Sequence, residues 1–363
     1  MLWLCASTTN NSDYTPLMNF YLNDLVRDNI LRLEPYSSAR SEFSGTAGVW
    51  LDANESPFND PYNRYPDPLQ KELKARISEI KGIDASSIFL GNGSDECIDL
   101  VYRVFCDPGI DNVVSIAPSY GMYEVCADIN DVLFRKVMLN DDFSLDFSKL
   151  AAACDAHTKA VWICSPNNPT GNAFATANLL DFCHNFSGIV VVDEAYIDFS
   201  SKGTMLAHLA QTPNLIVLQT FSKAWGSAGV RLGMAFASPE IISIFNKVKY
   251  PYNVNLLTQR YALNLITKAP EIKQWVSTIL DERDYLVNAL GKIAVVQHIY
   301  PSDANFILVK VDDADVLYDH LKSCGIIVRN RNRVEKCLCC LRITIGSHNE
   351  NVQLINAIND YAK

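Results

Sequence analysis

Three stretches constrain the fold most, because each begins as an apolar run and ends in a polar cluster: residues 161–171, 189–196 and 215–231. Short apolar runs rich in β-branched residues, ended by a turn, are typical of buried strands. In open α/β sheets, ligands bind beyond the carboxyl ends of the strands. We therefore expect the three polar clusters to form one site at the edge of a sheet.

The last of these clusters contains one lysine, Lys223, with Ser222 before it and Arg231 after it. A lysine, whose pKa is ordinarily about 10.4, becomes a nucleophile near neutrality only if a nearby cation or burial lowers that pKa. The Ser222 hydroxyl and the Arg231 guanidinium are suited to binding a phosphate. A lysine beside phosphate ligands indicates pyridoxal phosphate.

The other two clusters carry complementary groups. The Asp193 carboxylate can keep a pyridine nitrogen protonated, which makes the ring accept electrons. The Tyr196 phenol and the Asn168 amide can hydrogen-bond the phenolic oxygen of the same ring. Each cluster alone could be only a turn or a helix start, but the three in this order favour a cofactor site.

These stretches resemble the fold-type I pyridoxal-phosphate aminotransferases of class II. Further stretches, at residues 33–40, 51–55, 63–66, 118–123 and 340–346, resemble the histidinol-phosphate aminotransferase family, from about Met18 to the end of the chain. The resemblance implies an α/β fold with a large domain, whose mostly parallel sheet is flanked by helices, and a smaller α+β domain. It also implies pyridoxal 5′-phosphate bound as a Schiff base to Lys223.

Further cofactor contacts follow from the resemblance. A glycine-rich turn precedes Ser94 and Asp95 at a helix start, where backbone N–H groups favour an anion. Tyr120 is expected to stack on the ring, and Tyr65 to cross a dimer interface to the neighbouring subunit's cofactor phosphate. Three residues, Lys223, Asp193 and Tyr196, are expected to be catalytic. The expected cofactor-binding residues are Ser94, Asp95, Tyr120, Asn168, Asp193, Tyr196, Ser222, Lys223, Arg231 and Tyr65.

The resemblance assigns the substrate to two arginines, Arg329 and Arg342, and to Tyr36 and Asn54. A guanidinium matches both a carboxylate and a phosphate, so one site could accept glutamate and a phosphorylated partner in turn. The residues alone also allow Arg342 to form a surface ion pair and Arg329 to belong to a solvated basic loop.

The expected reaction is amino transfer between L-glutamate/2-oxoglutarate and imidazole acetol phosphate/L-histidinol phosphate, a step of histidine biosynthesis. The alternatives are a threonine-phosphate decarboxylase, an aromatic or broad-specificity aminotransferase, and a cofactor-binding regulatory domain without catalysis. We expect small-molecule substrates and a homodimer in the cytoplasm. The net charge of -10 disfavours nucleic acid and anionic membranes as partners.

The eleven cysteines are scattered or clustered in apolar runs, which is typical of reduced cysteines in a cytosolic enzyme, and no metal site is expected. We expect the 363 residues to divide into a disordered extension over residues 1–17, a small domain of residues 18–61 with 282–363, and a large cofactor-binding domain over residues 62–281. Periodicity predicts helices over residues 19–33 and 258–290 and short strands over residues 50–55 and 326–329.

Overall fold

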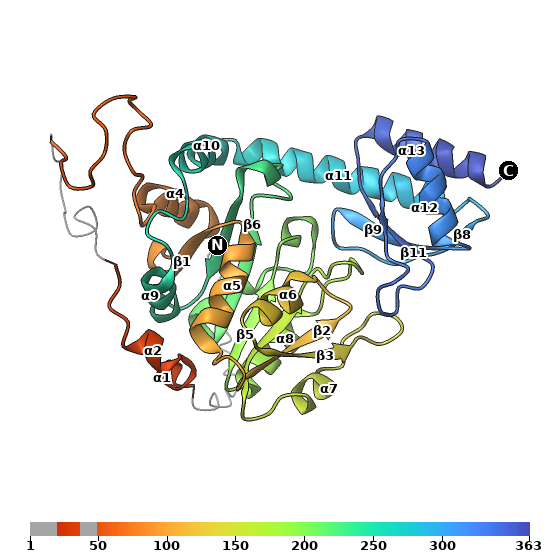
Figure 1. Cartoon of the computed structure of the whole chain (residues 1–363). Helices are drawn as coiled ribbons and strands as arrows, with labels where there is room; N and C mark the ends of the chain where they lie inside the picture. The colour runs from red at the N-terminus through yellow and green to blue at the C-terminus, as the bar shows by residue number, and fades with distance from the viewer. Residues whose placement is uncertain (1–19, 37–48) are drawn as a thin grey trace, which may run out of the picture.

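The computed structural model describes residues 20–36 and 49–363 (Figure 1). Within them the strands form a seven-stranded sheet in the order β1-β7-β6-β5-β4-β2-β3 and a four-stranded sheet in the order β10-β11-β9-β8. The extension expected over residues 1–17 lies outside the described residues.

The large sheet is mostly parallel, and this confirms the expected fold class. Strands β3, β2, β4, β5 and β6 run parallel, whereas β7 pairs antiparallel with both β6 and β1. The strands are β1 (Ile88–Asn92), β2 (Asn112–Ala117), β3 (Leu133–Met138), β4 (Thr158–Cys164), β5 (Ile189–Asp193), β6 (Leu215–Thr220) and β7 (Leu232–Phe236).

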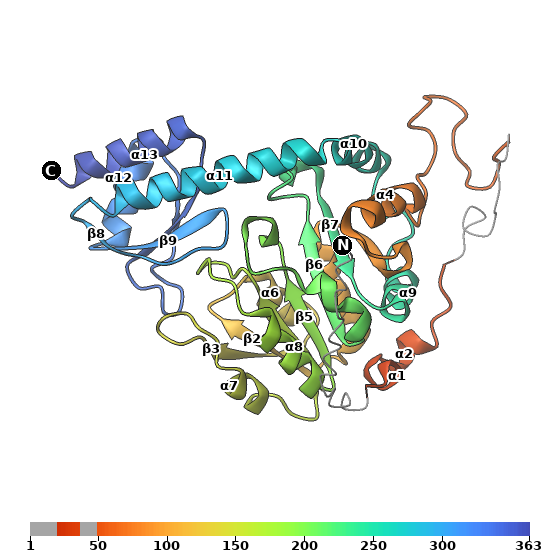
Figure 2. The ribbon, with the colours of Figure 1, turned by 180° about the vertical axis from the view of Figure 1, so that it is seen from behind.

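Helices cover both faces of this sheet, which is why its central strands are apolar throughout. In β5, Val190 and Val192 pack on one face and Ile189 and Val191 on the other. The first face is covered by α4 (Lys71–Lys81), α7 (Phe147–Ala152), α8 (Thr176–Asn185) and α10 (Leu256–Ile266) (Figure 2). The second is covered by α5 (Ser94–Phe105), α6 (Met122–Ile129) and α9 (Pro239–Val248).

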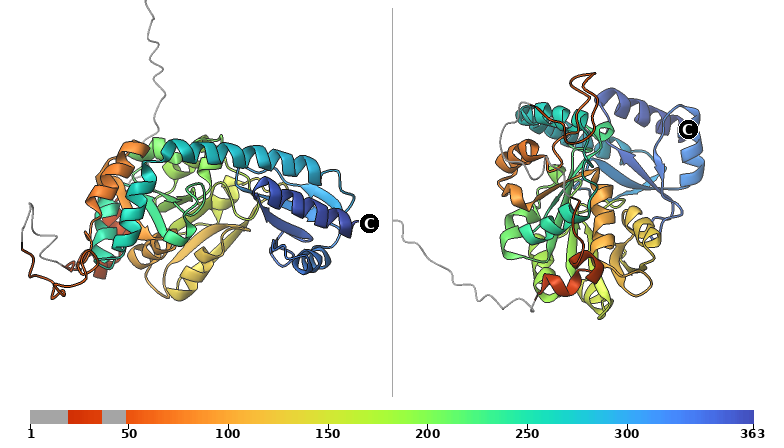
Figure 3. Two further views of the ribbon diagram at one scale, coloured as in Figure 1. Left: turned by 90° about the horizontal axis from the view of Figure 1, so that it is seen from above. Right: turned by 60° about the vertical axis from the view of Figure 1, so that its left-hand side comes forward.

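The small sheet is antiparallel and has its own apolar core. Its strands are β8 (Val296–Ile299), β9 (Phe306–Val311), β10 (Arg329–Asn330) and β11 (Cys340–Thr344). Helices α12 (Ala314–Ser323) and α13 (His348–Tyr361) pack on it. Helix α11 (Ala269–Leu290) extends from the large sheet to this small sheet (Figure 3).

Four local predictions were wrong in detail. The helix predicted over residues 258–290 is two helices, α10 and α11, because Pro270 occupies the first turn of α11 and starts a new helix there. The helix predicted over residues 19–33 is split into α1 (Leu22–Leu25) and α2 (Asp28–Leu31), because Val26 has an extended backbone. Residues 50–55 form no strand, and residues 326–329 contribute only the start of β10.

The predicted domain boundaries stay a prediction. The described part of the segment predicted to join the small domain, residues 20–36, packs on the large sheet: Val26 and Ile30 belong to the same apolar cluster as Phe105. The Arg27 backbone N–H also donates to the Val104 carbonyl over 3.0 Å. The boundary predicted between residues 281 and 282 falls inside α11.

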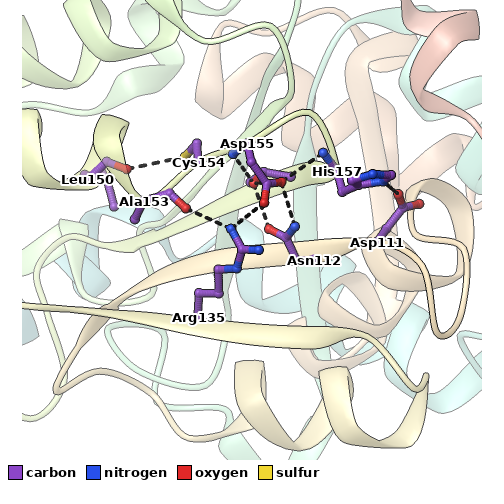
Figure 4. Close-up of polar contacts among 9 residues, drawn as sticks. Asp111, Asn112, Arg135, Leu150, Ala153, Cys154, Asp155 and His157 are labelled. Carbon is purple, nitrogen blue, oxygen red and sulfur yellow. Dashed lines mark hydrogen bonds and ion pairs between the residues drawn. The ribbon is translucent and has the colours of Figure 1, made fainter.

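A polar network lies at the N-terminal ends of β2 and β4, opposite the C-terminal ends where the polar clusters of the predicted site follow the strands (Figure 4). Asp155 accepts a hydrogen bond from Asn112 over 2.9 Å and pairs with Arg135 of β3 over 2.6 Å. Both contacts lower the pKa of the Asp155 carboxyl. The network therefore holds three strands together.

None of the described helices is both long enough and apolar enough to cross a bilayer.

Candidate active site

A cavity of about 680 Å³ lies beyond the carboxyl ends of the central strands. Loops after β2, β4, β5 and β6, the start of α5 and two strands of the small sheet contribute to its wall. The structure brings eleven of the predicted site residues together there: Ser94, Asp95, Tyr120, Asn168, Asp193, Tyr196, Ser222, Lys223, Arg231, Arg329 and Arg342. This is the expected position for a ligand in a sheet of this kind.

Lys223 follows β6 and is partly buried in the cavity wall, with its Nζ atom 5.3 Å from the centre of the Tyr196 ring. Burial lowers the pKa of Lys223, and the charges of Arg342 and Arg231 lower it further, while Asp193 and Asp95 oppose the shift. A lysine in this environment loses its proton more readily than a solvated one, as a nucleophile or general base requires.

Asp193 ends β5 and is only 3% exposed. One carboxylate oxygen accepts a hydrogen bond from the Tyr123 hydroxyl over 2.6 Å, and the other accepts from the Ala195 backbone N–H over 3.0 Å. Burial raises the pKa of Asp193, and these donors together with Lys223 lower it. The effect of burial is the larger, so the pKa of Asp193 lies above its ordinary value, and the donors limit this rise.

Tyr123 is a site residue that the sequence reasoning missed. It lies on α6, fully buried, and its ring stacks on Trp162 at 4.8 Å between ring centres. It also meets the Tyr120 ring edge-on at 5.6 Å. Its place one helical turn after Tyr120 was the only available signal, because a buried tyrosine in an amphipathic helix is ordinarily a core residue.

One wall of the cavity is built from Asn168, Tyr196 and Arg342. The Asn168 side-chain amide donates to the Tyr196 hydroxyl over 3.5 Å, and its carbonyl oxygen accepts from Arg342. The Arg342 guanidinium also lies over the Phe306 ring at 5.3 Å, and Phe306 meets Tyr196 edge-on. These contacts fix the arginine of the small sheet against two loops of the large sheet.

The end of the cavity near α5 is suited to an anion. The N-terminus of α5 begins at Ser94, where the dipole and the unpaired backbone N–H groups favour negative charge. Arg231 pairs with Asp95 over 3.2 Å, and Asp95 accepts from the Tyr120 hydroxyl over 3.2 Å. A Cβ atom on Gly93 would lie 2.5 Å from the Arg231 guanidinium, so a glycine is needed for this close approach.

The other end is cationic. Arg329 of β10 lies directly opposite Arg342 of β11 in the ladder, and Arg331 lines the same cavity. Like charges opposite one another on two strands are destabilising unless a ligand or counter-charge offsets them. The sequence reasoning named Arg329 and Arg342 and missed Arg331, since a run of alternating arginines does not reveal which of them face inward.

Three predicted residues lie outside this cavity. Asn54 and Tyr65 line a separate hollow of about 570 Å³, where the Tyr65 ring stacks on Tyr252 at 4.4 Å. Tyr36 is 73% exposed at the end of the described N-terminal segment. Within one chain, these three side chains therefore do not meet Lys223.

The donor set around the cavity fits pyridoxal phosphate. A lysine with a lowered pKa, a buried carboxyl group that accepts two hydrogen bonds, and a phenol and an amide are all present. The close approach of Gly93 and Arg231 beside the N-terminus of α5 forms a cradle for a phosphate. Among the residues that the structure describes, no group of His, Cys, Asp and Glu side chains could hold a metal ion.

The family model described as aminotransferase class I and II matches residues 41–358. A relative from Parabacteroides distasonis, named histidinol-phosphate aminotransferase, is 57% identical over 339 residues, covering 93% of this chain and 98% of its own. A relative of the same name from Cytophaga hutchinsonii is 49% identical over 348 residues, covering 95% of this chain and 100% of its own.

Two solved structures are also similar. Histidinol-phosphate aminotransferase from Sinorhizobium meliloti in complex with pyridoxal-5′-phosphate has a TM-score of 0.77 at 23% identity, covering 85% of this chain and 89% of its own. L-threonine-O-3-phosphate decarboxylase from Porphyromonas gingivalis has a TM-score of 0.71 at 20% identity, covering 83% and 91%. At these identities the likeness shows the fold alone, and the fold does not separate the two activities.

Proposed function

The chain belongs to the aminotransferase class I and II family, and we propose that it transfers the amino group of L-glutamate to imidazole acetol phosphate. The products are 2-oxoglutarate and L-histidinol phosphate, and the reaction is a step of histidine biosynthesis. Relatives that are 57% and 49% identical over nearly their whole length carry the name of this activity.

The observation that carries the proposal is the composition of one cavity. Lys223 lines one cavity with Asp193 and Arg342, whose charges both act on it, and Arg329 and Arg331 line the same cavity. A proton carrier next to a cationic surface is what amino transfer on an anionic substrate requires.

Pyridoxal 5′-phosphate supplies, when bound, an electrophilic carbon for the amino group and a ring that accepts electrons. The chain's residues then hold and move protons. Lys223, with its lowered pKa, would act as the general base that carries the proton of the substrate α-carbon. Asp193 would accept the proton of the ring nitrogen in a hydrogen bond, and its carboxyl group is oriented by the hydrogen bonds from Tyr123 and Ala195.

The remaining predicted residues hold and orient the two ligands. Tyr120 would hold the cofactor ring by stacking, and Tyr196 and Asn168 would hydrogen-bond its phenolic oxygen. Ser94, Asp95, Ser222 and Arg231 form the phosphate site of the cofactor, at the N-terminus of α5. The substrate is assigned to Arg329 and Arg342, together with Tyr36 and Asn54.

The assembly is a homodimer in the cytoplasm, in which Tyr65 reaches the partner's cofactor phosphate. Residues 49–66 project from the end of the molecule farthest from the small sheet (Figure 1). Large apolar side chains are exposed on them, including Leu51 at 91% and Phe58 at 78%. An exposed apolar segment of this kind is typical of a surface that a partner covers.

Replacing Lys223 tests the assignment. The Lys223→Ala variant should lose amino transfer while keeping the assembly state and circular dichroism of the wild type, because the side chain lines the cavity and is only partly buried. Lys202→Ala, at an exposed loop position, is the matched control and should keep full activity. Turnover retained by the Lys223 variant would remove Lys223 from the reaction.

The alternatives are tested on the same protein. A threonine-phosphate decarboxylase would release carbon dioxide from L-threonine O-3-phosphate, and an aromatic aminotransferase would use phenylalanine as well as histidinol phosphate. We expect no carbon dioxide release and a preference for L-histidinol phosphate.

A further inference from the structure

The cationic wall of the cavity contains one more arginine than the resemblance assigns. Arg329, Arg331 and Arg342 all line the cavity. Arg329 and Arg331 are separated by one residue along an extended segment, so they point to the same face of the strand. Asn330 and Asn332 point the other way, and both donate to Asp315, over 2.6 and 2.8 Å.

These three guanidinium groups lack a carboxylate partner in the described parts of the chain. Burial and the neighbouring arginines lower the pKa of Arg331 and Arg342, and the groups that oppose this are Tyr196 and, at Arg331, Cys337, with no aspartate or glutamate among them. For Arg331 the pKa falls to about 10. The cluster is therefore a concentration of positive charge that the protein leaves unbalanced.

Arg331 also holds a hydrogen-bond donor that has no partner. Its Nε atom is buried and makes no hydrogen bond, although the residue is placed firmly by the bond from its backbone N–H to the Cys340 carbonyl over 2.9 Å. A buried donor without an acceptor is costly, and the cost is relieved if a ligand oxygen binds there. An anion in the cavity would satisfy both this donor and the unbalanced charge.

The charge of the ligand decides how much a third arginine contributes. A phosphate monoester carries about -1.5 to -2 charges at pH 7 and offers three acceptor oxygens. A carboxylate carries one charge and two oxygens, which two arginines already match. On the basis of the proposed function, we propose that Arg331 is a specificity-determining residue that binds the substrate phosphate and favours phosphorylated substrates over plain amino acids.

The two half-reactions separate this role from a structural one. In the holoenzyme of Arg331→Gln, the efficiency of the half-reaction with L-histidinol phosphate should fall roughly 10- to 100-fold, the scale of one charged hydrogen bond. The loss should appear in KM rather than in the saturated rate. The half-reaction with L-glutamate should change much less, because glutamate has no phosphate.

Arg333→Gln is the matched control. Arg333 is exposed, lies outside the cavity and acts on Asp315 on the opposite side of the segment. It should leave both half-reactions as in the wild type. An equal loss for both substrates in Arg331→Gln, or the same loss in Arg333→Gln, would overturn the proposal. If Arg331→Gln fails to fold, Arg331→Lys replaces it, and the proposal requires a smaller loss confined to the phosphorylated substrate.

Inorganic phosphate tests Arg331 without relying on the natural substrate. Phosphate should compete with L-glutamate in the wild-type holoenzyme, whose cofactor already fills the other anion site, and should bind roughly tenfold more weakly to Arg331→Gln. Wild-type protein that ignores L-histidinol phosphate but shows this difference would refute the proposed function and keep the role of Arg331. Equal inhibition of both proteins would refute the role of Arg331.

Discussion

At the scale of single residues, the pKa values of the site depend on how far hydrogen bonds offset the effect of burial. Asp193 is the clearest case, since burial raises its pKa while the Tyr123 hydroxyl, the Ala195 backbone N–H and Lys223 lower it. The sequence indicated Asp193 because an acid ends an apolar strand. It did not indicate Tyr123, because a buried tyrosine on a helix is ordinarily a core residue and its contact with the end of β5 arises only in the folded chain.

Tyr123→Phe should shift the pH dependence of catalysis. Removal of the hydroxyl takes away a hydrogen bond that lowers the pKa of Asp193, so this pKa rises and the charged carboxylate is lost at a higher pH. The apparent pKa on the acidic side of the pH profile of kcat/KM should rise by about 1 to 2 units, as expected for a hydrogen bond to a charged group. Tyr102→Phe removes a buried hydroxyl that bonds the Tyr123 carbonyl rather than Asp193, and should leave this pKa of the profile unchanged. An unchanged acidic pKa in the Tyr123→Phe profile would show that this hydrogen bond does not set the pKa of Asp193.

Glu194, the neighbour of Asp193, should make stability depend on pH. Burial raises its pKa to about 7, against hydrogen bonds from Thr204, Met205 and Gln219. Because the folded protein binds this proton more tightly than the unfolded chain, the contribution to stability is full below about pH 4.3 and is lost as the pH rises through 7. Over that window wild type should lose roughly 3 kcal/mol more stability than Glu194→Gln, measured by urea unfolding at several pH values. The exposed Glu240→Gln should keep the wild-type slope, and an equal slope in Glu194→Gln would contradict this account.

At the scale of the elements, sequence patterns predicted the buried central strands, whereas a strand interrupted by charged residues was missed. β4, β5 and β6 are apolar runs and were predicted. β3 was missed because Arg135 and Lys136 interrupt its apolar residues, and neighbouring β2 supplies the pairing that makes it a strand. β10 and β11, the strands of the small sheet that carry Arg329 and Arg342, pair through a connection that no local sequence pattern predicts.

The contact between β7 and the start of α5 should be the element contact least tolerant of added volume. A Cβ atom on Gly233 would lie 2.1 Å from the Ser94 backbone nitrogen and 2.3 Å from the Gly93 carbonyl carbon, and backbone cannot move aside as a flexible side chain can. Gly233→Ala should therefore lower stability by about 1–3 kcal/mol or more and weaken cofactor binding at the N-terminus of α5. Gly229→Ala, whose Cβ would meet nothing within 4 Å, is the control. Equal melting temperatures for the two variants would contradict this reading of the contact.

At the scale of the whole molecule, the sequence predicted one site, whereas a single chain places the predicted site residues in two separate pockets. Tyr65 and Asn54 line one, and Lys223 lines the other. The order of residues along the chain does not show whether such residues meet within one subunit or between two subunits. The homodimer proposal resolves the division, because a symmetric pair of chains brings each Tyr65 to the partner's cavity.

Mixing two impaired variants should restore activity if Tyr65 acts across the dimer. In a mixed dimer of Lys223→Ala and Tyr65→Ala, one site lacks both side chains and the other has both. Random exchange of equal amounts makes half of the dimers mixed, so about a quarter of the wild-type activity should return. If Tyr65 served its own subunit, no mixed dimer would contain an intact site, and mixing would restore nothing.

The central claim is that this cavity exchanges an amino group with a phosphorylated substrate. The most direct measurement is the visible absorbance of the holoenzyme during a single half-reaction with L-histidinol phosphate. The account predicts that the band of the bound pyridoxal form disappears on mixing and returns when 2-oxoglutarate is added. A band that responds to L-glutamate but not to L-histidinol phosphate would keep the fold and the catalytic lysine, and would contradict the proposed substrate.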